Sequence, residues 1–160
     1  EATNLLKDII NNNRSDFRAY YLLGTLYLQL NNLDLAESNL RNAIKLNSKM
    51  SEAMHNLGII LSLKKNFIEA KDFFLKAIEI RPENLQSLIE LGRTYDLLNK
   101  FDEAKKTFEK ILRIDSENKV ASSLLGSMLL KKGLHSEGLE YLKKSSGLIR
   151  FDDKNFKIIK

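Results

Sequence analysis

The chain has 160 residues, enough for one domain, and its composition excludes several classes of protein. It contains no cysteine, which excludes disulfides and thiolate metal sites. No apolar run approaches the roughly 20 residues that span a bilayer, and no secretory signal is visible. We therefore expect a cytoplasmic protein without a membrane partner, and the richness in Lys, Asn and Ile suggests a bacterial source.

The net charge of +5 is concentrated at one end of the chain. Residues 1–118 carry 17 acidic and 17 basic side chains, whereas residues 119–160 carry 4 and 9. A basic end can attract an acidic or nucleic-acid partner. The bases are diffuse, however, and only Tyr141, Phe151 and Phe156 supply aromatic rings nearby. A solvated helix surface is favoured, and nucleic acid is an unlikely partner.

A helix without a partner is predicted at the start of the chain. Ala2, Leu6 and Ile9 have the spacing of a helical stripe that recurs from Ala36 onward. We interpret residues 1–16 as the second helix of a partial repeat. Because the chain also begins at Glu1 instead of methionine, we interpret it as a segment of a longer protein.

A constant period organises the rest of the chain. Four evenly spaced glycines, each preceded by leucine, keep this register: Gly24, Gly58, Gly92 and Gly126. A fixed period of about 34 residues predicts a repeat array. We place the repeats at 17–50, 51–84, 85–118 and 119–152, in one continuous domain, with 153–160 as a tail or the start of a next element.

Each repeat is predicted to be a helix, a turn and a second helix. The stripe Tyr20, Leu23, Gly24 and Tyr27 occupies one face of a helix, and a second stripe follows from Ala36. Asp34 and Asp102 are expected as N-caps or first-turn acids of second helices. We expect Gly24 to face Ala36 at a close helix approach. The predicted structural residues are Gly24, Ala36, Gly58, Ala70, Pro82, Gly92, Ala104 and Gly126.

This pattern resembles the tetratricopeptide repeat (TPR) family. Two stretches carry the resemblance best: Tyr20-Leu23-Gly24-Tyr27 and Ala70-Phe74-Ala77-Pro82. The third repeat fits through Leu91-Gly92-Tyr95 and Ala104-Phe108, whereas the fourth departs at Ser122, Gly138 and Ser145. The resemblance implies an all-α fold, a right-handed α-solenoid superhelix of antiparallel helix pairs.

No arrangement of residues predicts catalysis. His55 and His135 lie in different repeats without converging partners, and no Gly-rich phosphate loop follows a strand. His55 is either a ligand contact or a surface histidine, and His135, at a turn and helix start, is expected to have a surface or capping role. We predict no enzyme activity and no catalytic, cofactor or metal site.

The resemblance implies a concave groove lined by the first helices. The predicted peptide-binding positions are Arg18, Tyr21, Thr25, Leu28, Glu52, His55, Ile59, Gln86, Ile89, Arg93, Asp96, Ser123 and Ser127. This mixed surface suits an extended peptide or helix, and Tyr21 and Arg93 are the best anchor candidates. Tyr21 and Thr25 replace the Lys and Asn with which chaperone-binding TPR domains clamp a carboxylate, and Asn56 alone fits an asparagine ladder.

The tail leaves two alternatives open. Leu148 to Phe151 alternate as in a short strand after Gly147, whereas Phe156 and Ile159 have the spacing of another helix. We expect a non-catalytic scaffold that binds a protein or peptide partner. The alternative is the substrate-docking region of a larger enzyme of glycosyltransferase, sulfotransferase or oxygenase type.

Overall fold

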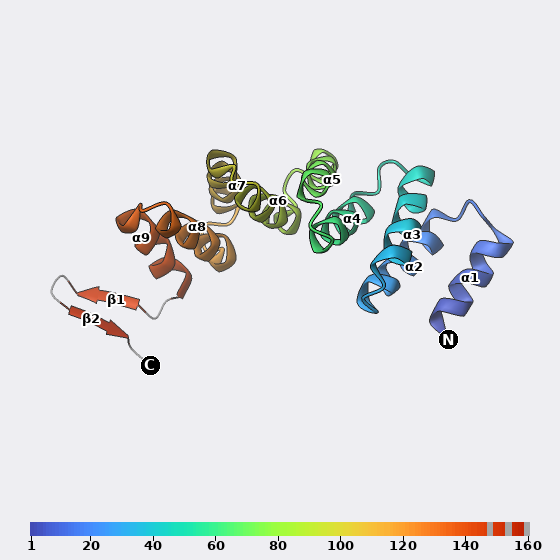
Figure 1. Ribbon diagram of the computed structural model, residues 1–160, viewed down its shortest axis with the longest axis horizontal. Coiled ribbons are helices and arrows are strands. Elements are labelled where there is room, and N and C mark those ends of the chain that lie inside the picture. Colours follow the sequence, from blue (N-terminus) through green and yellow to red (C-terminus); the bar gives the residue numbers. More distant parts are fainter. Residues whose placement is uncertain (147–148, 153–154, 159–160) are drawn as a thin grey trace. The chain divides into compact units, whose positions relative to one another are not determined.

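The computed structural model describes residues 1–146, 149–152 and 155–158 (Figure 1). Helices occupy most of the described chain and pack as consecutive pairs, which confirms the prediction of an all-α helical-repeat solenoid. The described helices are α1 (Ala2–Asn12), α2 (Phe17–Gln29), α3 (Leu33–Leu46), α4 (Ser51–Leu63), α5 (Phe67–Ile80), α6 (Leu85–Leu97), α7 (Phe101–Ile114), α8 (Lys119–Lys131) and α9 (His135–Ser146).

The chain divides into two compact units, residues 1–87 and 88–160, and the division falls inside α6. In the first unit, α2 packs against α1 and α3, and α4 packs against α3 and α5. In the second unit, α8 packs against α7 and α9. Helices α2 to α8 each bury a stripe of mainly small and apolar side chains, whereas α9 buries Gly138 and α1 has no buried residue. No single helix here is long enough to be stable alone.

The turns inside the repeats share one hydrogen-bonded form. Asn31, Lys65, Asn99 and Gly133, one from each repeat, have positive φ between 56° and 79°. In the first turn the N–H of Asn31 donates to Leu28 and that of Asn32 donates to Tyr27. This pattern recurs in the other three turns and is the Schellman motif, which satisfies the last carbonyls of a helix.

The two acidic residues expected at the start of second helices lie in the first turn, which is one of the two positions predicted for them. Asp34 and Asp102 are first-turn acids, and the N-cap positions before them belong to Asn32 and Lys100. The Asn32 side chain accepts a hydrogen bond from the backbone N–H of Leu35. The polar turn residue therefore caps the second helix as well as ending the first.

The close approach of paired helices differs from the prediction in its partner. A Cβ placed on Gly24 would lie 2.8 Å from Cγ of Leu40, so the nearest neighbour is the large residue of the second stripe and not Ala36. In the last pair a Cβ on Gly126 would lie 2.8 Å from both the carbonyl oxygen of Gly138 and Cγ of Leu142. The glycines thus accommodate a bulky side chain in all four pairs, and in the fourth also the backbone of Gly138.

A hairpin of two antiparallel strands follows α9. Strand β1 (Ile149–Asp152) pairs with β2 (Asn155–Ile158), with Ile149 opposite Ile158. The strand predicted around 148–151 agrees with β1, and the alternative of a further helix from Phe156 is wrong, because this residue lies in β2. Gly147, Leu148 and Ile159 lie outside the described residues.

Candidate functional site

The open face of α2 carries the first four candidate residues. Ala19, Leu23, Gly24 and Tyr27 are buried, and they form the stripe that packs against neighbouring helices. The candidates occupy the adjoining face at intervals of three and four residues: Arg18 is exposed, and Tyr21, Thr25 and Leu28 are partly buried. The local fold therefore leaves a continuous strip of mixed character along this helix.

The first helices of the next repeats also carry the candidate residues on an accessible strip beside a buried stripe. In α4 the candidates Glu52, His55 and Ile59 are partly buried, and Gln86 at the start of α6 is exposed. In the second unit Ile89, Asp96 and Ser123 are partly buried, and Arg93 and Ser127 are exposed. None of the thirteen candidates is fully buried, so all of them keep some accessible surface.

Several candidate side chains already bond to a neighbouring helix or loop. The Asn56 side-chain amide donates to the Thr25 hydroxyl over 3.2 Å, which joins α4 to α2. Glu52 forms an ion pair of 2.7 Å with Arg81 in the loop after α5. In the second unit Lys131 lies 3.5 Å from the Asp96 carboxylate. These polar groups position adjacent repeats and are less available to a ligand.

His55 is partly buried and has a partner within the protein, and its contact with a ligand stays a prediction. Its Nδ1 lies 3.0 Å from the hydroxyl of Ser87, and its ring lies 5.9 Å from that of Phe74. Partial burial lowers the pKa of His55 below its ordinary value, because the charged imidazolium loses contact with water. The imidazole therefore connects α4 to the first turn of α6. Because His55 and Ser87 belong to different repeats, their spacing offered no sign of this pairing.

Tyr21 and Arg93 stay available as anchors. The Arg93 side chain is half exposed, and its weak ion pair with Glu90 spans 4.0 Å. Tyr21 keeps part of its ring accessible beside the exposed Arg18, whose guanidinium lies over Phe17. The candidate residues thus include one accessible aromatic ring and two accessible guanidinium groups.

One buried hydroxyl on α4 has no hydrogen-bond partner among the described residues. Ser62, on the same face of this helix as His55 and Ile59, has a buried hydroxyl without a hydrogen-bond partner in the described chain. A buried hydroxyl in this state costs stability unless a ligand or water bonds to it. It adds a polar position to the strip that the candidate residues form on α4.

The residues predicted to have structural roles are all buried except Pro82. The four repeat glycines are buried, as are Ala36, Ala70 and Ala104, whereas Pro82 is exposed in the loop after α5. Proline at this place ends the helix by lacking a backbone N–H, so its effect needs no packing contact. The small residues act through close packing and Pro82 acts through the backbone.

The described residues hold neither a metal-binding cluster nor a membrane-spanning helix. Nowhere in 1–146 or the two strands do three or more His, Cys, Asp or Glu side chains gather closely enough to hold a metal ion. No described helix has the length and apolar character needed to cross a bilayer.

Comparisons with known proteins agree with this geometry. Family models of the tetratricopeptide repeat match residues 17–50 and 49–117. No curated protein matches the chain. The similar solved structures include MamA (41-end) from Desulfovibrio magneticus RS-1, with a TM-score of 0.86, 20% identity, and coverage of 91% of this chain and 82% of that one.

Two further structures are similar over comparable lengths. YrrB, described as a TPR protein with an unusual peptide-binding site, has a TM-score of 0.77, 23% identity, and coverage of 89% of this chain and 75% of that one. Pseudomonas aeruginosa PilF has a TM-score of 0.79, 22% identity, and coverage of 89% and 65%. Such identities show a shared fold alone. With the family matches extending over residues 17–117, the chain belongs to the tetratricopeptide repeat family.

Proposed function

We propose that this chain is a non-catalytic scaffold that binds an extended peptide or a helix of a protein partner on the open face of its first helices. Membership of the tetratricopeptide repeat family supports the coarser part of this statement, a scaffold for protein–protein interaction. The repeats we assign, 17–50, 51–84, 85–118 and 119–152, supply one first helix each to the candidate set.

One observation carries the proposal. On each first helix a stripe of buried residues lies beside a strip of partly exposed residues. Taken together, these exposed strips combine apolar, aromatic and charged side chains. Leu28, Ile59 and Ile89 supply apolar contacts, and Tyr21 and Arg93 supply the residue types that dominate interface energies. An extended segment held by apolar contacts with a few polar anchors fits this composition. The description of YrrB as a protein with a peptide-binding site adds support from one structural relative.

The experiment is a selection of displayed random dodecapeptides on the immobilised chain. Affinities of the selected peptides are then measured for Tyr21→Ala and Arg93→Ala. We expect losses of roughly tenfold or more for at least one of the two, as is common for aromatic and Arg anchors. Retained helical circular dichroism shows that the fold persists.

Matched controls separate the proposed face from the rest of the surface. Leu22→Ala removes an apolar side chain that is 52% exposed on the same helix but outside the candidate set. Arg14→Ala removes an exposed guanidinium from the loop before α2. Unchanged affinity in both anchor variants, with a loss in either control, would mean that the binding surface lies elsewhere.

A further inference from the structure

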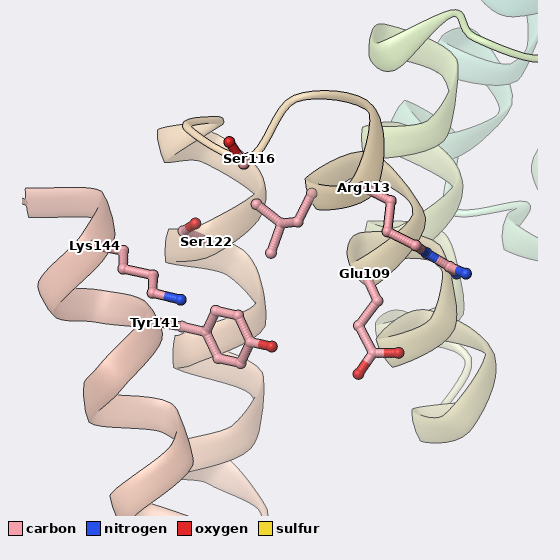
Figure 2. A pocket seen from close by; sticks show the side chains of 7 residues that line it. Glu109, Arg113, Ser116, Ser122, Tyr141 and Lys144 are labelled. Carbon is pink, nitrogen blue, oxygen red and sulfur yellow. The ribbon is translucent and has the colours of Figure 1, made fainter.

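Two cavities on the second helices occupy the same place in different repeats. The first, which we name the Phe73 pocket, has a volume of about 690 Å³ and is lined from α3, α4 and α5 in the first unit. The second, the Tyr141 pocket, has a volume of about 350 Å³ and is lined from α7, α8 and α9 in the second unit (Figure 2). No residue of the first-helix candidate set lines either pocket.

An aromatic ring with a lysine three residues later defines each pocket. Nζ of Lys76 lies 4.8 Å from the ring centroid of Phe73. Two repeats further on, Nζ of Lys144 lies 5.6 Å from the ring centroid of Tyr141. Figure 2 shows the Lys144 amine and the Tyr141 ring together on the face of α9 that lines the pocket. Each pocket therefore presents an apolar ring with a positive charge beside it.

The fold itself does not require this ring. In the other two full repeats the equivalent positions hold Asn39 and Thr107. The Thr107 hydroxyl donates to the carbonyl oxygen of Glu103 within its own helix, so these repeats form without an aromatic side chain at this place. A residue needed for packing between helices would be expected in every repeat, as the repeat glycines are.

The walls of the two pockets also correspond. Ile44 and Leu112, one to each pocket, come from the last turns of α3 and α7 and are two repeats apart. Ser48 and Ser116 come from the loops after these helices and share the same register. An aliphatic wall, an aromatic wall and a hydroxyl make a small amphipathic site in each unit.

The charged side chains leave both pockets with an excess of positive charge. Lys49 and Lys76 face one carboxylate, Glu79, at the Phe73 pocket. Arg41 also lies over the Phe73 ring, but its guanidinium is held by ion pairs with carboxylates of α3 and α5. The two lysines therefore provide the charge that a ligand can neutralise.

The Tyr141 pocket has the same balance of charge. Arg113 and Lys144 face one carboxylate, Glu109, which Figure 2 shows on α7 across from the Tyr141 hydroxyl. Neither cation forms an ion pair with any described carboxylate, and the same is true of the two lysines of the Phe73 pocket. Uncommitted cations beside an apolar cavity favour a ligand that carries a carboxylate next to an apolar group.

We propose that the Phe73 and Tyr141 pockets are two additional binding sites, each of which takes a short acidic segment of a protein partner with one large apolar side chain. The apolar side chain enters the pocket against the aromatic ring, and a neighbouring Asp or Glu carboxylate pairs with Lys76 or Lys144. The sites share no residue with the first-helix candidate set, so the scaffold can hold two different segments at once.

The test is an NMR titration of the isotope-labelled chain with the peptide acetyl-Asp-Leu-Glu-amide. We expect the largest amide shifts near Phe73, Lys76, Tyr141 and Lys144. The uncharged isostere acetyl-Asn-Leu-Gln-amide should bind each pocket roughly threefold or more weakly, because it loses the exposed charge pair. Equal binding of the two peptides, or shifts confined to the first-helix face, would overturn the proposal.

Variants that copy a side chain from another repeat, or that remove only a charge, provide the structural control. Phe73→Asn and Tyr141→Asn introduce the side chain that Asn39 already has at this place, and Lys76→Gln and Lys144→Gln remove only charge. Each variant should weaken binding at its own pocket and leave the other pocket unchanged. Tyr21→Ala should leave both pockets unchanged, which separates this proposal from the one for the first helices. Undiminished binding in the folded Asn and Gln variants would refute it.

Discussion

Nδ1 of His55 lies 3.0 Å from the hydroxyl of Ser87 and connects two repeats through one hydrogen bond. Ser87 is buried, and the imidazole is packed beside Phe74. Desolvation by partial burial lowers the pKa of His55 below its ordinary value, because it disfavours the charged imidazolium. The stability of the contact between α4 and the first turn of α6 should therefore depend on pH.

The direction of this dependence follows from proton linkage. Because the folded pKa lies below the unfolded one, the unfolded chain binds more protons as the pH falls below about 6.5. The contribution of His55 is complete above that value and is lost as the pH falls toward the folded pKa. We expect His55→Gln to lose less stability than the wild type between about pH 7.5 and about pH 5.5 in urea unfolding.

The exposed histidine gives the control for this measurement. His135→Gln changes a histidine at the start of α9 that is exposed to solvent. Its pH profile should follow the wild type. Parallel profiles for the wild type and His55→Gln would show that the histidine does not contribute to the pH dependence.

Gly58 provides a test of the close packing between paired helices. A Cβ on this residue would lie 2.6 Å from Cε1 of the buried Phe74, a separation that forces the ring or the helix to move. We expect Gly58→Ala to lower the free energy of unfolding by about 1–3 kcal/mol, despite the higher helix propensity of alanine. Thermal or urea unfolding measures this change.

A control variant separates the effect of packing at Gly58 from the helix propensity of alanine. Ser127→Ala also introduces a better helix former into a first helix, but at an exposed position. This variant should be unchanged or slightly more stable. A Gly58→Ala protein as stable as the wild type would indicate that the Phe74 ring can shift without cost.

The repeat period predicted most of the fold, for a physical reason. The helical stripes and the register of the glycines depend on local sequence, so the positions of the helices could be read directly. The positive φ values in the turns could also have been predicted, since Asn31, Asn99 and Gly133 are residue types that tolerate this backbone conformation. The side chain nearest to Gly24 could not be predicted from the sequence, because it depends on the rotation of two helices about their axes.

The candidate site was less predictable, because its polar residues bond to residues in other repeats. Thr25 and His55, two of the predicted groove positions, each bond to a side chain about one repeat away, and no pattern in the sequence indicated these pairings. The two second-helix pockets left a visible signal, the aromatic residues Phe73 and Tyr141 in alternate repeats. Within a single helix, however, such a residue cannot be told from an ordinary packing residue.

Substitution of Ser62 tests whether a polar group on the first-helix face lowers the stability of the fold. Its buried hydroxyl has no hydrogen-bond partner in the described structure. Replacing it in Ser62→Ala removes an unsatisfied group, so we expect stability to be unchanged or higher by up to about 1 kcal/mol. Thr107→Ala, which removes a satisfied hydroxyl from α7, should be less stable. A clear loss of stability in Ser62→Ala would indicate that the hydroxyl has a partner after all.

Lys65 is the turn residue least suited to its backbone conformation. Its φ of 61° lies close to those of Asn31 and Asn99, but lysine has neither the freedom of glycine nor the local hydrogen bonding of asparagine. We expect Lys65→Gly to raise the free energy of unfolding by about 0.5–1 kcal/mol, since relief of the left-handed strain exceeds the added entropy of the unfolded glycine. Asn31→Gly should give a smaller gain, because asparagine already tolerates this conformation. Urea unfolding of both variants measures the difference, and a loss of stability in Lys65→Gly would show that the lysine side chain contributes more to the turn than its backbone strain removes.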